Sequence, residues 1–227
     1  MVTVLSLGGS IVAPDNPDTE FLSSFVALVR SWLAEDNSRK LILVVGGGGP
    51  ARAYQKAFRA IVPNSSNDEA DWVGIMATRL NAQLLKAIFA DICPGAVVYD
   101  PTKVDVFTGR IIVAAGWKPG FSTDNDAVLL AERFNANTVI NLSNIAKVYT
   151  DDPRTNPDAK PIDEITWADF RKIVGDEWVP GKNVPFDPVA SLHAEKAKLR
   201  VICAAGRDIE NLRNILDGKK FIGTVIN

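Results

Sequence analysis

The sequence is poor in the side chains that most often serve as bases or metal ligands. Its 227 residues include one histidine and two cysteines, so a histidine-based triad or a zinc site is poorly supported. His193 falls in a helical pattern, and we expect it to be a surface or packing residue. Cys93 and Cys203 lie in apolar segments without the spacing of metal ligands. We expect reduced core residues, and the alternative is a disulfide between them.

The sequence also lacks a strong net charge and long apolar runs. The formal net charge is -2 and the sequence pI is about 5.5, which argues against nucleic acid as a partner. No apolar run reaches the roughly 18 residues of a membrane-spanning helix, and the first residues show no signal-peptide pattern. We therefore expect a cytoplasmic protein without a membrane partner. Its hydrophobic content of 47% suffices for one large domain or two small ones.

Short continuous apolar runs alternate with segments of helical spacing along the chain. Strands are expected at residues 2–7, 41–45, 96–99, 111–114, 138–142, 200–204 and 221–226. Helices are expected at residues 21–33, 54–61, 71–88, 127–134, 167–173, 190–198 and 211–216, and a loop at 149–162. Such alternation is typical of a mostly parallel sheet with helices on both faces. The sequence therefore predicts the α/β class, as a three-layer αβα sandwich in a single domain over residues 1–227.

Two glycine-rich turns directly follow apolar strands. Gly8-Gly9-Ser10 follows the strand at 2–7, and Gly46 to Gly49 follow the strand at 41–45. A strand, a glycine turn and a helix start together aim backbone N–H groups at an anion, and a Cβ there would keep the backbone away from a phosphate. Neither turn is a Walker A motif or a G-x-G-x-x-G fingerprint. The alternative for each is a tight turn without a ligand.

The carboxyl ends of parallel strands meet at one edge of the sheet, where ligands bind. Both glycine turns and the loop around Asp124 follow strands, so we expect them to face one cleft. Two anion cradles in one cleft suggest two phosphate-bearing ligands, a donor and an acceptor. Arg52, just after the second turn, could place its guanidinium on phosphate oxygens. Asp71 and Asp124 have an alternative, structural interpretation as carboxylates at helix N-termini.

Several ordered motifs carry a resemblance to a known superfamily. They are Leu-Ser-Leu-Gly-Gly-Ser at 5–10, Val-Val-Gly-Gly-Gly-Gly-Pro-Ala-Arg at 44–52, Asp-Trp-Val-Gly-Ile-Met-Ala-Thr-Arg-Leu-Asn-Ala at 71–82, Pro-Gly-Phe-Ser-Thr-Asp at 119–124, Val-Tyr-Thr-Asp-Asp-Pro at 148–153 and Gly-Thr-Val-Ile at 223–226. Their order and spacing resemble the amino acid kinase superfamily over nearly the whole chain. The segment at 71–82 favours, within it, the uridylate (UMP) kinases of the archaeal type.

This resemblance implies an amino acid kinase-like fold with an acceptor side in its N-terminal part and an ATP side in its C-terminal part. The implied enzyme transfers the γ-phosphate of ATP to UMP, giving UDP for pyrimidine nucleotide biosynthesis, with Mg²⁺ carried by the nucleotide. The implied partners are small nucleotides and further copies of the chain in a homohexamer. The alternatives are a non-catalytic nucleotide- or oxyanion-binding protein of this fold, and a kinase for another small phosphate such as isopentenyl phosphate.

The resemblance also implies the residues of the site, with no metal ligands of the protein's own among them. The catalytic residues would be Gly8, Gly9, Ser10, Arg52 and Asp124. The UMP-binding residues would be Gly47, Asp71, Pro119, Gly120, Phe121, Ser122, Thr123, Asp124 and Asn125. The ATP-binding residues would be Ser6, Leu7, Gly8, Gly9, Ser10, Gly48, Arg52, Ser143, Asn144, Tyr149 and Asp152. In these sets Asp71 would hold the UMP ribose, and Tyr149 would offer its ring to adenine.

The chain departs from the superfamily pattern at three places. Ser6 stands where many members carry a lysine that stabilises transition-state charge, and this keeps the non-catalytic alternative open. Ala146-Lys147 replaces a frequent Asp-Gly pair, so we expect the ATP-side loop to differ. The segment at 182–188 lacks a clear match to a lysine that some relatives use. Lys147 and Lys182 are candidates for the missing positive charge, and each has the alternative of a solvated surface lysine.

Overall fold

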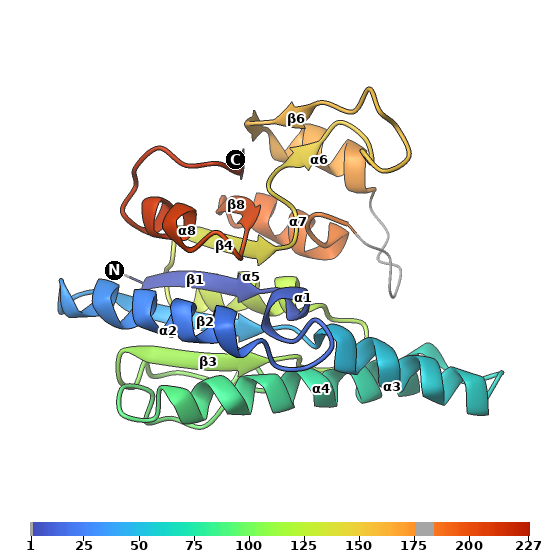
Figure 1. Cartoon of the computed structure of the whole chain (residues 1–227), viewed down its shortest axis with the longest axis horizontal. Coiled ribbons are helices and arrows are strands. Elements are labelled where there is room, and N and C mark those ends of the chain that lie inside the picture. The colour runs from blue at the N-terminus through green and yellow to red at the C-terminus, as the bar shows by residue number, and fades with distance from the viewer. Residues whose placement is uncertain (1, 176–183) are drawn as a thin grey trace.

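The computed structural model describes residues 2–175 and 184–227, which form an α/β fold around a central sheet (Figure 1). The described residues give this sheet seven strands, in the order β3-β2-β1-β4-β8-β9-β7. These strands are β1 (Val2–Leu7), β2 (Lys40–Val45), β3 (Ile111–Ala115), β4 (Thr138–Ser143), β7 (Glu164–Ile165), β8 (Arg200–Ala205) and β9 (Thr224–Ile226). All neighbouring pairs are parallel except β8 and β9. The predicted mostly parallel sheet is confirmed.

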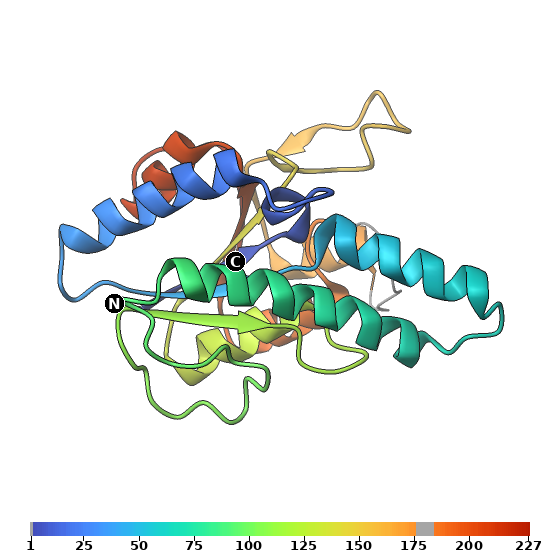
Figure 2. The same cartoon turned by 60° about the horizontal axis from the view of Figure 1, so that its bottom comes forward.

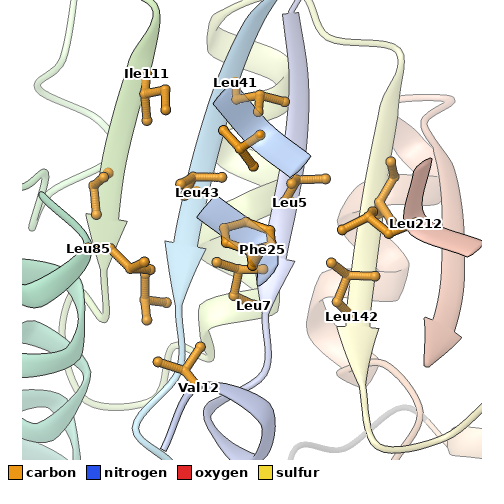
Figure 3. Close-up of a cluster of buried hydrophobic side chains, with 14 of the residues drawn as sticks. Leu5, Leu7, Val12, Phe25, Leu41, Leu43, Leu85, Ile111, Leu142 and Leu212 are labelled. Atoms are coloured by element: carbon orange, nitrogen blue, oxygen red, sulfur yellow. The ribbon is translucent and has the colours of Figure 1, made fainter. Parts of the chain in front are cut away.

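Helices cover both faces of the sheet because its long strands are apolar on both sides. One layer consists of α2 (Thr19–Ala34), α4 (Asn67–Ile88) and α8 (Ile209–Leu216). The other layer consists of α5 (Thr123–Arg133), α6 (Trp167–Val174) and α7 (Pro188–Lys196). Successive strand side chains point to opposite faces, so Leu5 and Leu7 pack with Phe25 and Leu85 in the first layer (Figure 3), whereas Val4 packs in the second. The predicted αβα sandwich is confirmed.

The helix α3 (Gly48–Ile61) packs along α4 and not on the sheet, and the two helices together extend beyond it (Figures 1 and 2). None of the residues described in α3 is buried. Tyr54 and Ile61, on the apolar face that the sequence indicates for this helix, are 68% and 80% exposed. Among the described residues, no helix has both the length and the apolar character needed to cross a bilayer.

Several element boundaries differ from the sequence prediction. Residues 96–99 form no strand, and Val98 makes only an isolated bridge to Ala114. The long helix α4 begins at Asn67, four residues before the expected start, because Ser66 and Glu69 form a capping box. The final strand is limited to Thr224–Ile226.

The segment expected to be a loop at 149–162 also contains regular structure at its ends. The strands β5 (Val148–Tyr149) and β6 (Pro161–Ile162) pair as a small antiparallel ribbon. The residues between them remain irregular, in agreement with their content of proline and aspartate. This ribbon lies apart from the central sheet.

Candidate active site

The two glycine turns lie against each other at the carboxyl ends of β1 and β2. The first leads from β1 into the short helix α1 (Gly9–Val12), and the second leads from β2 into α3. A Cβ built on Gly9 would overlap the backbone nitrogen of Gly48, and a Cβ on Gly46 would overlap that of Gly9. The turns are therefore in direct backbone contact, and no side chain can separate them.

Four backbone N–H groups of these turns have no partner among the residues that the structure describes. They belong to Gly9, Ser10, Gly47 and Gly48. Each lies at the start of a helix, where an N–H group has no intrahelical acceptor. The neighbouring N–H groups are used within the protein: Gly8 donates to the carbonyl of Leu142 at 2.8 Å, and Gly49 to that of Ala13 at 2.9 Å. Donors of this kind at helix starts are the groups that bind phosphate oxygens in proteins, and we call these four N–H groups the cradle.

The structure gives an additional reason for glycine in the second turn. Gly48 has a φ of +66°, and a Cβ there would overlap the carbonyl oxygens of Ala13 and Gly9. A Cβ on Gly47 would lie 2.6 Å from the Cβ of Ala51. At both positions the added atom would meet the protein itself. Gly48 is required by its contact with Gly9 and Ala13, and Gly47 by its packing against Ala51. The expectation that glycine also lets the backbone approach a phosphate stays a prediction.

Asp124 lies in the first turn of α5, next to the end of β1. Its Oδ1 accepts a hydrogen bond from the Oγ of Ser6 at 3.0 Å, and its Oδ2 accepts one from the backbone N–H of Asp187 at 3.3 Å. Burial, together with the nearby Asp187 carboxylate, raises the pKa of Asp124 to about 7. The N-cap of α5 is Ser122, whose Oγ accepts a hydrogen bond from the N–H of Asn125 at 3.2 Å. The interpretation of Asp124 as the N-cap is therefore wrong, although Asp124 does lie in the first turn of the helix.

Two further polar residues of α5 are buried beneath this site. Asn125 and Asp126 are each 1% exposed. The Oδ1 of Asn125 lies 2.8 Å from the Nδ1 of His193 on α7, so His193 is a packing residue, as the sequence predicts. The Oδ2 of Asp126 accepts a hydrogen bond from the N–H of Trp117 at 3.2 Å. Burial raises the pKa of Asp126 to about 8.

This raised pKa predicts how the stability of the protein depends on pH. Between an ordinary aspartate pKa of about 4 and the folded value of about 8, Asp126 keeps a proton in the folded chain and loses it in the unfolded chain. The free energy of unfolding therefore falls as pH rises through this range. Asp126→Asn cannot ionise, so its melting temperature should fall less than that of the wild type between pH 5 and 8. Asp158→Asn, on an exposed loop, controls for the loss of one charge. Parallel melting curves for Asp126→Asn and the wild type would contradict this prediction.

Asp71 lies on α4 and reaches the loop between β3 and α5. Its Oδ2 accepts a hydrogen bond from the N–H of Gly120 at 3.2 Å, and burial raises its pKa. In the same loop, the rings of Phe121 and Trp117 pack edge to face with their centroids 4.8 Å apart. Because α4 begins at Asn67, Asp71 lies beyond its first turn, and the alternative interpretation as a residue of the helix N-terminus is wrong. The remaining residues expected at the UMP site follow along this loop and the start of α5: Pro119, Ser122 and Thr123.

The residues assigned to the ATP side lie at the end of β4 and in the β5–β6 ribbon. Ser143 is the last residue of β4, and the exposed Asn144 follows it. Tyr149 is half-buried in β5. The carboxylate of Asp152 accepts a hydrogen bond from the guanidinium of Arg154 at 2.7 Å, and this contact lowers the pKa of Asp152 to about 2. A ligand hydroxyl at Asp152 would therefore share the carboxylate with Arg154.

The candidate cations differ in their surroundings. Arg52 is exposed, and its Nη2 donates to the carbonyl of Pro14 at 3.2 Å, so little restrains it from turning toward a phosphate. Lys147 is engaged in an ion pair with Asp163. Lys182 lies outside the described residues.

Three residues of α4 that sequence reasoning did not assign hold the two loops of the site. Asn81 contacts the second glycine turn, and Thr78 and Arg79 contact the loop after β3. The Oγ1 of Thr78 accepts from the N–H of Gly116 at 2.9 Å, and Arg79 donates to the carbonyl of Trp117 at 2.9 Å. The sequence signal for these residues is that the polar Thr78 and Asn81 interrupt an otherwise apolar helical face. The structure shows that both side chains are buried.

Known proteins share this architecture along the whole chain. Residues 1–205 match the family model described as "Amino acid kinase family". The chain belongs to the amino acid kinase family. It is 36% identical to a uridylate kinase of Methanospirillum hungatei, over 98% of this chain and 93% of that protein. It is 35% identical to a uridylate kinase of Thermococcus onnurineus, over 100% of this chain and 99% of that protein.

Solved structures agree with this family membership. The crystal structure of a uridylate kinase from Archaeoglobus fulgidus has a TM-score of 0.83 and 32% sequence identity, and the comparison covers 100% of both chains. A UMP kinase from Bacillus anthracis, at 19% identity and a TM-score of 0.78 over 100% of this chain and 95% of that one, shares the fold. The resemblance to uridylate kinases of the amino acid kinase family, inferred from motifs, is thus confirmed.

Proposed function

We propose that this protein is a UMP kinase that transfers the γ-phosphate of ATP to UMP, giving ADP and UDP. The observation that carries the proposal is the contact between the two glycine turns, which brings together four N–H groups that have no partner in the described part of the chain. A donor and an acceptor phosphate bound there would lie side by side. The full-length similarity to proteins named uridylate kinase supports UMP as the acceptor. The UDP formed would enter pyrimidine nucleotide biosynthesis.

The chemistry requires little covalent participation by the protein. Phosphoryl transfer needs in-line positioning and stabilisation of charge on the transferring oxygens. Preorganised backbone N–H groups stabilise that charge at low reorganisation cost. The acceptor phosphate is already ionised near neutral pH, so no strong general base is needed. We propose that Gly8 to Ser10 hold the transferring phosphate, Gly47 contacts UMP, and Gly48 and Arg52 contact ATP.

Each side of the paired glycine turns would receive one nucleoside. On the acceptor side, Asp71 would accept hydrogen bonds from the UMP ribose, and the loop from Pro119 to Ser122, with the start of α5 as far as Asn125, would contact the nucleotide. On the donor side, Ser6 and Leu7 lead into the first glycine turn, and Ser143, Asn144, Tyr149 and Asp152 would line the adenosine pocket. The N-terminal part of the chain thus forms the acceptor side of a single domain, and the C-terminal part forms the ATP side.

Asp124 would organise the charge at the centre of the site. A Mg²⁺ ion carried by ATP needs few protein carboxylates besides the phosphates. Asp124 fits this requirement, since its carboxyl group is hydrogen-bonded to Ser6, two residues before the first glycine turn, and has a pKa of about 7 that a nearby cation would lower. When bound, the ion would offset the phosphate charge that a lysine offsets in many relatives.

The hydrogen bond from Ser6 predicts a pH-dependent effect of Ser6→Ala. This bond lowers the pKa of Asp124, so its removal should raise that pKa and leave less of the ionised carboxylate at pH 7. We expect kcat to fall several-fold at pH 7 and to recover most of its value at pH 8.5. The measurement is the pH profile of kcat for both proteins, with melting temperature as the control. An equal loss at both pH values would show that the hydroxyl acts in another way.

A substrate screen tests the proposed activity. Purified protein, ATP and Mg²⁺ are combined with UMP, CMP, dUMP or isopentenyl phosphate, and ADP release is followed in a coupled assay. We expect the highest kcat/KM with UMP. A preference for isopentenyl phosphate would identify another kinase of this fold. Nucleotide binding without ADP release from any acceptor would support the non-catalytic alternative.

We also propose that the protein is a cytoplasmic homo-oligomer, a homohexamer by family resemblance. Support comes from apolar side chains that remain exposed along α3 and α4: Tyr54, Ile61, Trp72, Met76 and Leu80. Residues 72, 76 and 80 are one helical turn apart and share one face of α4. Light scattering after size-exclusion chromatography measures the mass, and Leu80→Lys should reduce it if this face is an interface.

A further inference from the structure

Asn81 connects α4 to the second glycine turn through its side-chain amide. The residue is 4% exposed. Its Nδ2 donates to the carbonyl of Gly46 at 2.9 Å and to that of Gly47 at 3.2 Å. Carbonyl oxygens only accept hydrogen bonds, so the amide nitrogen must be the group that faces them. One side chain thus fixes two successive peptide groups of the turn.

The direction of those two carbonyls determines the direction of two N–H groups. In a trans peptide, the C=O and the following N–H point to opposite sides. With the Gly46 carbonyl turned toward α4, the N–H of Gly47 points away from α4. The Gly47 carbonyl fixes the N–H of Gly48 in the same way. These are two of the four N–H groups that have no partner among the described residues.

The backbone alone does not select this orientation. A peptide group flanked by glycines can rotate by half a turn, because glycine adopts both signs of φ without steric cost. The peptide between Gly47 and Gly48 is of this kind, with Gly48 at a φ of +66°. After such a rotation, a carbonyl oxygen would take the place of the N–H group and repel a phosphate. An external constraint is needed, and Asn81 supplies it from a helix that is packed into the core.

We propose that Asn81 is a positioning residue for phosphate binding, which keeps the N–H groups of Gly47 and Gly48 directed away from α4 and available to a phosphate. The identity of the phosphate as that of a nucleotide substrate rests on the proposed function. Asn81 touches neither nucleotide in this arrangement and acts through the glycine turn. Its removal therefore weakens phosphate binding and slows transfer without removing any substrate contact.

Two variants test this role. Asn81→Leu keeps the shape of the side chain and removes the donor, whereas Asn81→Asp keeps the shape and replaces the donor with an acceptor. Both should weaken UMP binding in calorimetry at least tenfold and lower kcat/KM for UMP more than tenfold, with Asn81→Asp the more affected. In ¹⁵N-resolved spectra of the wild type, UMP should shift the amide resonances of Gly47 and Gly48. These shifts should be lost in both variants.

Asn211 is the matched control. It is also a buried helical asparagine, and its side chain exchanges two hydrogen bonds of 2.7 Å with Ile222 on another part of the molecule. Asn211→Leu should lower the melting temperature while KM and kcat stay near wild type. If the Asn81 variants likewise only melt earlier, with UMP affinity and glycine shifts intact, the inference is wrong.

The test separates this inference from the proposed function. If the wild type does not phosphorylate UMP, the proposed function fails, and ADP replaces UMP as the probe in the binding and spectral measurements. Weaker ADP binding in the Asn81 variants than in Asn211→Leu would then uphold the positioning role. Equal ADP binding in all three variants would overturn it.

Discussion

Gly48→Ala is expected to lower kcat/KM for UMP by about 10²-fold or more, since displacements near 1 Å in an active site can cost that much. A Cβ at this position would overlap the carbonyl oxygens of Ala13 and Gly9. Both are backbone atoms, so the overlap is relieved only when the two glycine turns move apart. The free N–H groups of the cradle then no longer converge on the phosphates. Steady-state kinetics with UMP and ATP measure the loss.

Gly218→Ala provides the control for backbone strain. Gly218 has a φ of +67°, nearly that of Gly48, but a Cβ there would meet nothing within 4 Å. Each variant bears the cost of placing an L-residue in the left-handed region, about 1 kcal/mol. Only Gly48→Ala should also lose activity, and circular dichroism should show that both are folded. Equal activity of the two variants would place the catalytic phosphates elsewhere.

Asp71→Ala is expected to raise KM for UMP and to remove the preference for UMP over dUMP. A carboxylate that accepts from ribose hydroxyls loses a partner when the 2′-OH is missing, and hydrogen bonds to charged groups contribute about 1.5–3 kcal/mol. The wild type should therefore favour UMP by roughly 10- to 100-fold in kcat/KM. In the variant both substrates should react at the lower rate, and KM for ATP should change much less.

Asp68→Ala controls for the effect of charge near the start of α4. Asp68 lies in the first turn of that helix and is exposed. Its replacement should therefore lower the stability of the protein only by the small favourable interaction of its charge with the helix dipole. The ratio of kcat/KM for UMP and dUMP is measured in all three proteins, together with their melting temperatures. An unchanged ratio in Asp71→Ala would assign Asp71 to holding Gly120 alone, and the acceptor side would need a different ribose contact.

The central sheet and the meeting of the glycine turns could be predicted because they depend on short-range patterns. Continuous apolar runs identify β1 and β2. Because these strands are parallel, the glycine turns that follow them meet at the same edge of the sheet. Helix starts were harder to predict, since several capping residues occur in a row. Ser66 caps α4 several residues before the apolar pattern at Trp72, and Ser122 precedes four other polar residues that could cap α5.

The contacts that support the site could not be predicted from the sequence. A polar residue in a helical pattern does not reveal its partner, so Asn81 gives no sign that it holds Gly46 and Gly47. The same is true of Ser6, whose hydroxyl meets a carboxylate 118 positions away in the chain. Such pairs arise when distant segments pack together, and local spacing does not encode them.

The contact between Gly9 and Gly48 also constrains how this chain can evolve. A side chain at either position would strike the main chain of the other turn. No smaller residue exists with which the partner position could compensate, because both are already glycine. A substitution at one turn therefore cannot be rescued by a second substitution at the other. The two turns, separated by nearly forty residues of sequence, are inherited as a single unit, and descendants that keep the cradle keep both glycines.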